Sequence, residues 1–94
     1  MLELRVEAGG VVRIQGRLDA SESDGALATL EKLPGPMTLD CTQLEYISSA
    51  GISVIMQTWK RLNGQGSTLR MTGMTPRVRN VFAYAGLDKV LDIQ

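Results

Sequence analysis

The 94-residue chain contains no histidine and only one cysteine, Cys41. Without histidine it lacks the commonest general base of enzymes, and the usual zinc-ligand sets are absent as well. A lone cysteine cannot form an internal disulfide, which is typical of proteins of the reducing cytoplasm. We therefore expect no metal site, no cofactor and no enzymatic activity.

An excess of charge of either sign is also missing. Lys and Arg total 10, and so do Asp and Glu, whereas a small nucleic-acid binder normally shows a basic excess. No apolar run approaches the roughly 20 residues that cross a bilayer. The N-terminal residues Met1–Glu7 alternate charged and apolar side chains, unlike a signal peptide. We expect a single cytoplasmic domain, residues 1–94, that binds no nucleic acid and inserts into no membrane.

The first half of the chain begins with a hairpin pattern. Leu2, Leu4 and Val6 alternate with charged residues, as in a half-buried strand. A second alternating strand follows the turn at 8–10 and is expected to end at Gly16. Ser21 is placed to cap a first helix, whose apolar positions Leu27, Leu30 and Leu33 precede the breaker Pro34-Gly35-Pro36.

The second half alternates strands and helices. We expect residues 37–41 to form a short inner strand, residues 43–47 a loop, and residues 67–71 another strand. A helix between them has apolar residues at i, i+3, i+4 and i+7 spacing, and its polar positions are expected to face solvent. Thr75-Pro76 is expected to begin a third helix, whose inner face consists of Val78, Val81, Phe82 and Ala85. Gly86 can adopt the left-handed backbone conformation that often ends a helix. In the helix between the predicted loop at 43–47 and the strand at 67–71, the apolar positions are Ile52, Ile55, Met56, Trp59 and Leu62, and the polar side has Ser53, Gln57, Lys60 and Arg61.

The order of elements predicts an α/β fold. Strands that alternate with helices form mainly parallel sheets, so we expect a mixed four- to five-stranded sheet, opened by the hairpin and accompanied by three main helices. The final strand would come from Val90–Ile93. Alternation in the hairpin strands indicates that one face of the sheet is less covered than the other.

Two segments carry a family resemblance. Residues 39–52, Leu-Asp-Cys-Thr-Gln-Leu-Glu-Tyr-Ile-Ser-Ser-Ala-Gly-Ile, combine a strand, a loop and two serines that lead into a helix. This stretch resembles the signature of the STAS family, and Gly16-Arg17-Leu18-Asp19 resembles the family's recurring Leu-Asp element. The order of elements is also similar, so the resemblance covers the whole chain. It is closest in type to the bacterial anti-sigma factor antagonists.

The resemblance implies a regulatory cycle. Such antagonists bind an anti-sigma factor that is also a serine kinase, are released when it phosphorylates them, and are restored by a PP2C-type phosphatase. Matched to this chain, the phosphorylated residue is Ser49 and the motif glycine is Gly51. Ser48 stands where the antagonists usually carry Asp, and Ala50 replaces a second hydroxyl residue. The implied partner-binding set is Asp19, Ser48, Ser49, Ala50, Gly51 and Ser53.

Simpler interpretations remain open for the same residues. Ser48 or Ser49 could serve only as a helix cap, and Asp19 could only bond its own loop. Cys41, Met56 and Trp59 are expected in the core. Some STAS proteins are constitutive accessory subunits, for example of lipid-transport ABC complexes, and this is the alternative function.

The chain lacks the residues that two common classes of enzyme require. The chain has no Gly-x-Ser-x-Gly motif and no histidine for a serine hydrolase. Gly64-Gln65-Gly66-Ser67 lacks the lysine and the length of a P-loop.

Overall fold

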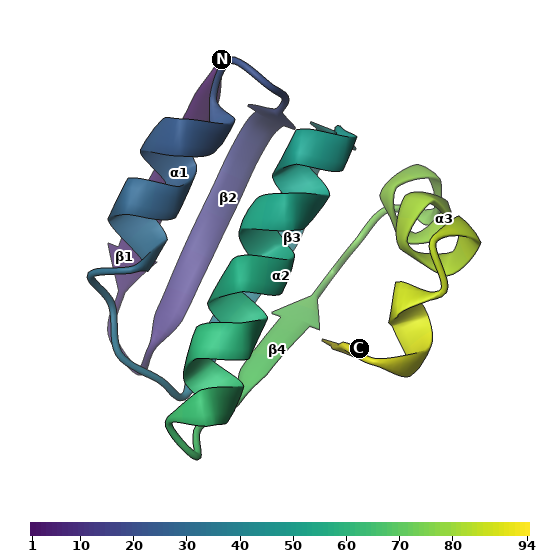
Figure 1. Ribbon diagram of the computed structural model, residues 1–94. Coiled ribbons are helices and arrows are strands. Elements are labelled where there is room, and N and C mark those ends of the chain that lie inside the picture. Colours follow the sequence, from purple (N-terminus) through teal and green to yellow (C-terminus); the bar gives the residue numbers. More distant parts are fainter.

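The computed structural model describes all 94 residues and shows one five-stranded sheet with helices (Figure 1). The strands lie in chain order; the first pair is antiparallel and the other neighbours are parallel. The predicted mixed sheet, opening hairpin and three main helices are therefore confirmed. The elements are β1 (Leu2–Glu7), β2 (Val11–Leu18), α1 (Ser23–Leu30), β3 (Met37–Ile47), α2 (Ser49–Gly64), β4 (Leu69–Thr72), α3 (Pro76–Tyr84), the 3-10 turn η1 (Leu87–Lys89) and β5 (Asp92–Ile93).

The two faces of the sheet differ in character. Figure 1 shows α1 and α2 side by side in front of the sheet, with α3 beyond β4. The side chains between these helices and the sheet form the core, where Ile14, Leu39 and Phe82 are fully buried. On the opposite face the register aligns charged residues across strands, with Arg13 between Arg5 and Asp40. The expected difference in cover between the two faces is confirmed.

β3 is much longer than predicted. The residues expected to form a loop, 43–47, belong to this strand, which runs for 11 residues. Its pairing with β2 shifts register twice, so that the buried residues Cys41, Leu44 and Ile47 follow one another at intervals of three. Such bulges insert unpaired residues and break the two-residue period. The sequence pattern looked like a loop for this reason.

The transition from β2 to α1 also differs from the prediction. β2 does not end at Gly16 but continues to Leu18, because glycine alone readily adopts the backbone angle of that position, φ 105°. Ser21 does not cap α1. The helix begins after Glu22, which makes no side-chain cap bond, and Ser21 instead bonds Asp19.

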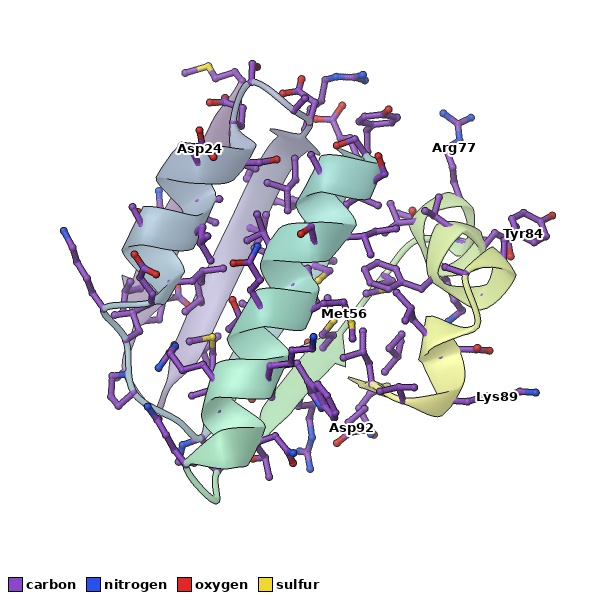
Figure 2. All side chains as sticks on the ribbon, viewed as in Figure 1. Asp24, Met56, Arg77, Tyr84, Lys89 and Asp92 are labelled. Atoms are coloured by element: carbon purple, nitrogen blue, oxygen red, sulfur yellow. The ribbon has the colours of Figure 1, made fainter.

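The buried face of α2 is centred slightly away from the predicted one. Val54, Ile55 and Leu62 are buried, whereas Met56 and Trp59 are half-buried and pack against the core edge. Figure 2 places Met56 on the side of α2 that faces α3.

The expectation of a solvent-facing Arg61 is wrong. Arg61 Nη2 donates hydrogen bonds to the carbonyl oxygens of Leu30 and Leu33, at 2.9 and 3.0 Å. These carbonyls lie at the end of α1 and just after it, where helical C=O groups lack intrahelical partners. Arg61 therefore ties the end of α1 to α2.

The C-terminal third follows the sequence closely. Thr75 caps α3 by accepting a bond from Val78 N, and Pro76 occupies the first helical position. Val78 and Phe82 are buried, but Ala85, predicted on the inner face, is exposed. Gly86 is left-handed as predicted, with φ 74°.

The single cysteine of the chain lies in the core. Cys41 is fully buried, as predicted, and burial raises the pKa of its thiol to about 12. The thiol therefore stays protonated near neutral pH.

No helix in the structure combines the length and the apolar character that spanning a bilayer requires.

Candidate functional site

The candidate site lies where β2 and β3 end side by side. Because these strands are parallel, their carboxyl ends meet at one edge of the sheet, and the Leu-Asp element comes next to the two serines. Ser48 N donates to Leu18 O at 3.0 Å. The two segments that carry the family resemblance are therefore joined through the backbone.

Ser48 is the cap of α2. Its Oγ accepts a hydrogen bond from Gly51 N at 3.2 Å, and it lies 3.5 Å from Leu18 O, to which it can donate. The half-buried hydroxyl is thus engaged with both strand and helix. Of the two serines left open as candidate caps, Ser48 has this role, and capping stabilises by about 1 kcal/mol.

Ser49 is the first residue of α2, and its side chain is exposed. The first turn of a helix carries N–H groups without intrahelical partners and a partial positive charge, and α2 has no acidic residue there. A negative group on Ser49 would therefore be tolerated by its own domain. The geometry leaves this hydroxyl open to another molecule.

Gly51 is required by close packing. A Cβ atom at this position would lie 2.6 Å from Leu18 O and 2.8 Å from Ile47 Cγ1. Any other residue would push the start of α2 away from the sheet. The motif glycine thus holds the serines at the edge where β2 ends, while Ala50 beside it is half-buried.

Asp19 supports its own loop. Its carboxylate accepts from Ser21 N at 3.2 Å and from Ser21 Oγ at 2.8 Å. These bonds, the Ser21 hydroxyl first among them, lower the pKa of Asp19. Its carbonyl accepts from Ser23 Oγ at 2.7 Å, so Asp19 orders the β2–α1 loop beside the serines without bonding Ser49 itself.

Further polar groups extend the surface around Ser49. Ser53 is exposed one turn along α2 and accepts from Gln57 Nε2 at 3.2 Å; residues four apart share one face of a helix. The sequence reasoning missed Arg17 and Tyr46, which face each other just before the strand ends, with the guanidinium 4.3 Å from the ring centre. Both residues lie in the two segments that carry the family resemblance, but only the β2–β3 register brings them together.

The arrangement brings the predicted site residues together at one edge of the sheet. Asp19, Ser48, Ala50 and Gly51 shape the edge of the sheet, and Ser49 and Ser53 present exposed hydroxyls. No group of three or more metal-binding side chains comes together in the structure.

Comparison with known proteins gives a family and a fold. The family model described as "Mlab, STAS domain" matches residues 3–92. An anti-sigma F factor antagonist of Paenibacillus polymyxa is 25% identical over 88 residues, covering 88% of this chain and 75% of that protein.

Two solved structures share the fold. An anti-sigma factor antagonist from Mycobacterium paratuberculosis superposes with a TM-score of 0.77 at 20% identity, covering 99% of this chain and 83% of the other. The Bacillus cell fate determinant SpoIIAA in its phosphorylated form gives a TM-score of 0.72 at 17% identity, covering 100% and 91%.

Proposed function

The chain belongs to the STAS domain family, and from that premise we propose that it is an anti-sigma factor antagonist. It is a non-enzymatic, single-domain binding module of the bacterial cytoplasm. Unphosphorylated, it binds an anti-sigma factor that is also a serine kinase. Phosphorylation of Ser49 releases it, and a PP2C-type phosphatase restores binding.

The exposed hydroxyl of Ser49 carries this proposal. It stands at a helix start that Ser48 and Gly51 hold close to the end of β2. A phosphate there adds about −1.5 to −2 charges. Within a packed interface that charge would have to be desolvated without a dedicated partner, so the complex, rather than the domain, is destabilised. The name of the Paenibacillus relative agrees with this role.

The test compares capture of a purified anti-sigma factor kinase from the same genome by wild type, Ser49→Asp and Ser49→Ala. We expect Ser49→Asp to weaken capture by at least about tenfold, because an uncompensated interface charge costs on the order of 1–3 kcal/mol. Ser49→Ala should bind like wild type. Thr68→Asp is the matched control, because Thr68 is exposed and precedes β4 at the opposite end of the sheet.

A second measurement addresses the modification itself. Incubation with the kinase and ATP, followed by mass spectrometry, should add one phosphate to wild type and none to Ser49→Ala. Equal capture of the three proteins together with an unmodified Ser49 would reject the switch and leave the fold untouched.

One observation favours a second function. Ser48 occupies the place where the antagonists usually carry Asp, and its hydroxyl is already bonded within the domain. Position 48, directly before Ser49 in the chain, therefore carries no carboxylate. A constitutive accessory subunit of a lipid-transport ABC complex would need none. Co-purification of an ABC ATPase subunit, in place of a kinase, would support this function.

A further inference from the structure

The free edge of the sheet has unpaired backbone groups in a regular order. β1 is an outer strand, paired on one side only. Arg17 N donates to Met1 O at 3.0 Å, and the β1–β2 register runs without a bulge. Hydrogen-bonded pairs alternate along an antiparallel ladder. The N–H and C=O groups of Leu2, Leu4 and Val6 therefore point away from β2, toward the free edge.

In one antiparallel register, the charged residues of two β1 strands from two copies of the chain are complementary. If a second β1 runs antiparallel with Leu4 opposite Leu4, Glu3 of each copy lies opposite Arg5 of the other. Leu2 then lies opposite Val6, and each of these apolar pairs can exchange two backbone hydrogen bonds. A shift of two residues would bring Glu3 opposite Glu3, or Arg5 opposite Arg5. A shift of one residue would reverse the faces.

A second carboxylate beside Arg5 would be electrostatically favourable. Its cross-strand neighbour is Arg13, and like charges in that position are destabilising. Arg13 already has Glu7 at 3.5 Å and Asp40 at 3.7 Å, whereas the ion pair of Arg5 is with Glu3 at 3.2 Å. A second copy of Glu3 would offset the repulsion between the two arginines.

The helix side of the edge has room for the second strand. Val6 is 55% exposed there, although it lies on the same side as the half-buried Leu2 and Leu4. A hollow of about 270 Å³ lies beside these leucines, lined by Glu22 just before α1 and by Gly25, Ala26 and Thr29 of α1. A Cβ added to Gly25 would meet no atom within 4 Å. Small residues on α1 thus leave space where Leu4 and Val6 of another copy would arrive.

We propose that two copies of this chain form a symmetric dimer through antiparallel pairing of β1, centred on Leu4. The two sheets join into one, and the two-fold axis closes the assembly. The Ser49 sites then face opposite ways at separate ends of the joined sheet, so both stay open. The proposal does not rest on the proposed function.

Sedimentation equilibrium of the chain with a C-terminal tag tests the dimer. A concentration series reaching about 1 mM populates even a weak association, and wild type should change from monomer to dimer within it. Glu3→Arg and Arg5→Glu should each weaken the dimer by about tenfold or more, because two cross-strand pairs become like-charged. Glu45→Arg and Arg77→Glu, exposed changes away from the edge, should leave it unchanged.

Mixing the two variants gives the sharpest result. The Glu3→Arg chain presents arginine at both positions and the Arg5→Glu chain presents glutamate at both, so the mixture should form a heterodimer with about wild-type affinity. Neither chain regains its own ion pair between positions 3 and 5. A wild type that stays monomeric at every concentration overturns the proposal. A dimer whose dissociation constant is unchanged in Glu3→Arg and Arg5→Glu also overturns it. Circular dichroism verifies that each variant is folded.

Discussion

The starts of α2 and α3 form a natural comparison within the molecule. Both follow a parallel strand, and both are capped by a hydroxyl that accepts from the third helical residue: Ser48 from Gly51 at 3.2 Å, and Thr75 from Val78 at 3.3 Å. At this third position α3 places a buried Val78, whereas α2 has a bare glycine because Leu18 O occupies the space.

The first helical position differs as well. In α3 it is Pro76, which has the right backbone angle but no reactive group. In α2 it is Ser49, an exposed hydroxyl. The same cap therefore serves a purely structural helix start in one case. In the other it supports a start that is packed against the end of β2 and presents an exposed hydroxyl.

The largest effect is expected from filling the space at Gly51. Gly51→Ala places a methyl group 2.6 Å from Leu18 O, and we expect it to destabilise the fold by about 3 kcal/mol, at the upper end for overpacking. Val78→Ala, at the equivalent position of α3, removes buried atoms and should cost about 2 kcal/mol. Urea unfolding measures both. A fully stable Gly51→Ala protein would show that the close approach is not needed.

Removing the two caps should have smaller effects of unequal size. Thr75→Ala should cost about 1 kcal/mol, whereas Ser48→Ala should cost up to about 2 kcal/mol. The difference is expected because the Ser48 hydroxyl also lies within reach of Leu18 O, at 3.5 Å. Ser49→Ala, which removes an exposed hydroxyl, should stay within about 0.5 kcal/mol. Equal losses for Ser48→Ala and Thr75→Ala would contradict the added tie to β2.

The smallest effect concerns Asp19, which has no counterpart at the start of α3. Its bonds to Ser21 lower the pKa of Asp19 below the ordinary 3.8. A lowered pKa means that the carboxylate contributes stability at pH values above 3.8, and that this contribution is lost as the pH falls through the folded-state value. An NMR titration should give a midpoint below 3.8, and Ser21→Ala should raise it. An unchanged midpoint in that variant would remove Ser21 as the cause.

Much of the fold could be predicted from local patterns. Alternating residues such as Leu2, Leu4 and Val6 predict the hairpin, because the period of a strand is two. Thr75-Pro76 predicts the start of α3, because capping and a fixed proline angle act within one turn. The burial of Cys41 was also anticipated.

The candidate site was predictable only in part. The resemblance pointed to Asp19 and to residues 48–51, and the structure brings these segments together. Which serine caps the helix, and why Gly51 is glycine, could not be read from spacing, since both depend on Leu18 O, about 30 positions earlier in the chain. The proximity of Arg17 and Tyr46 depends on the β2–β3 register.

By itself, the sequence determined the type and order of most elements and the two serines that lead into a helix, because propensities, caps and hydrophobic periods act over a few residues. Only the tertiary structure decided the bulged length of β3, the tie of Arg61 to the end of α1, and the fastening of α2 against β2. Those features arise where distant segments compete for the same space and the same backbone partners. No local pattern records that competition.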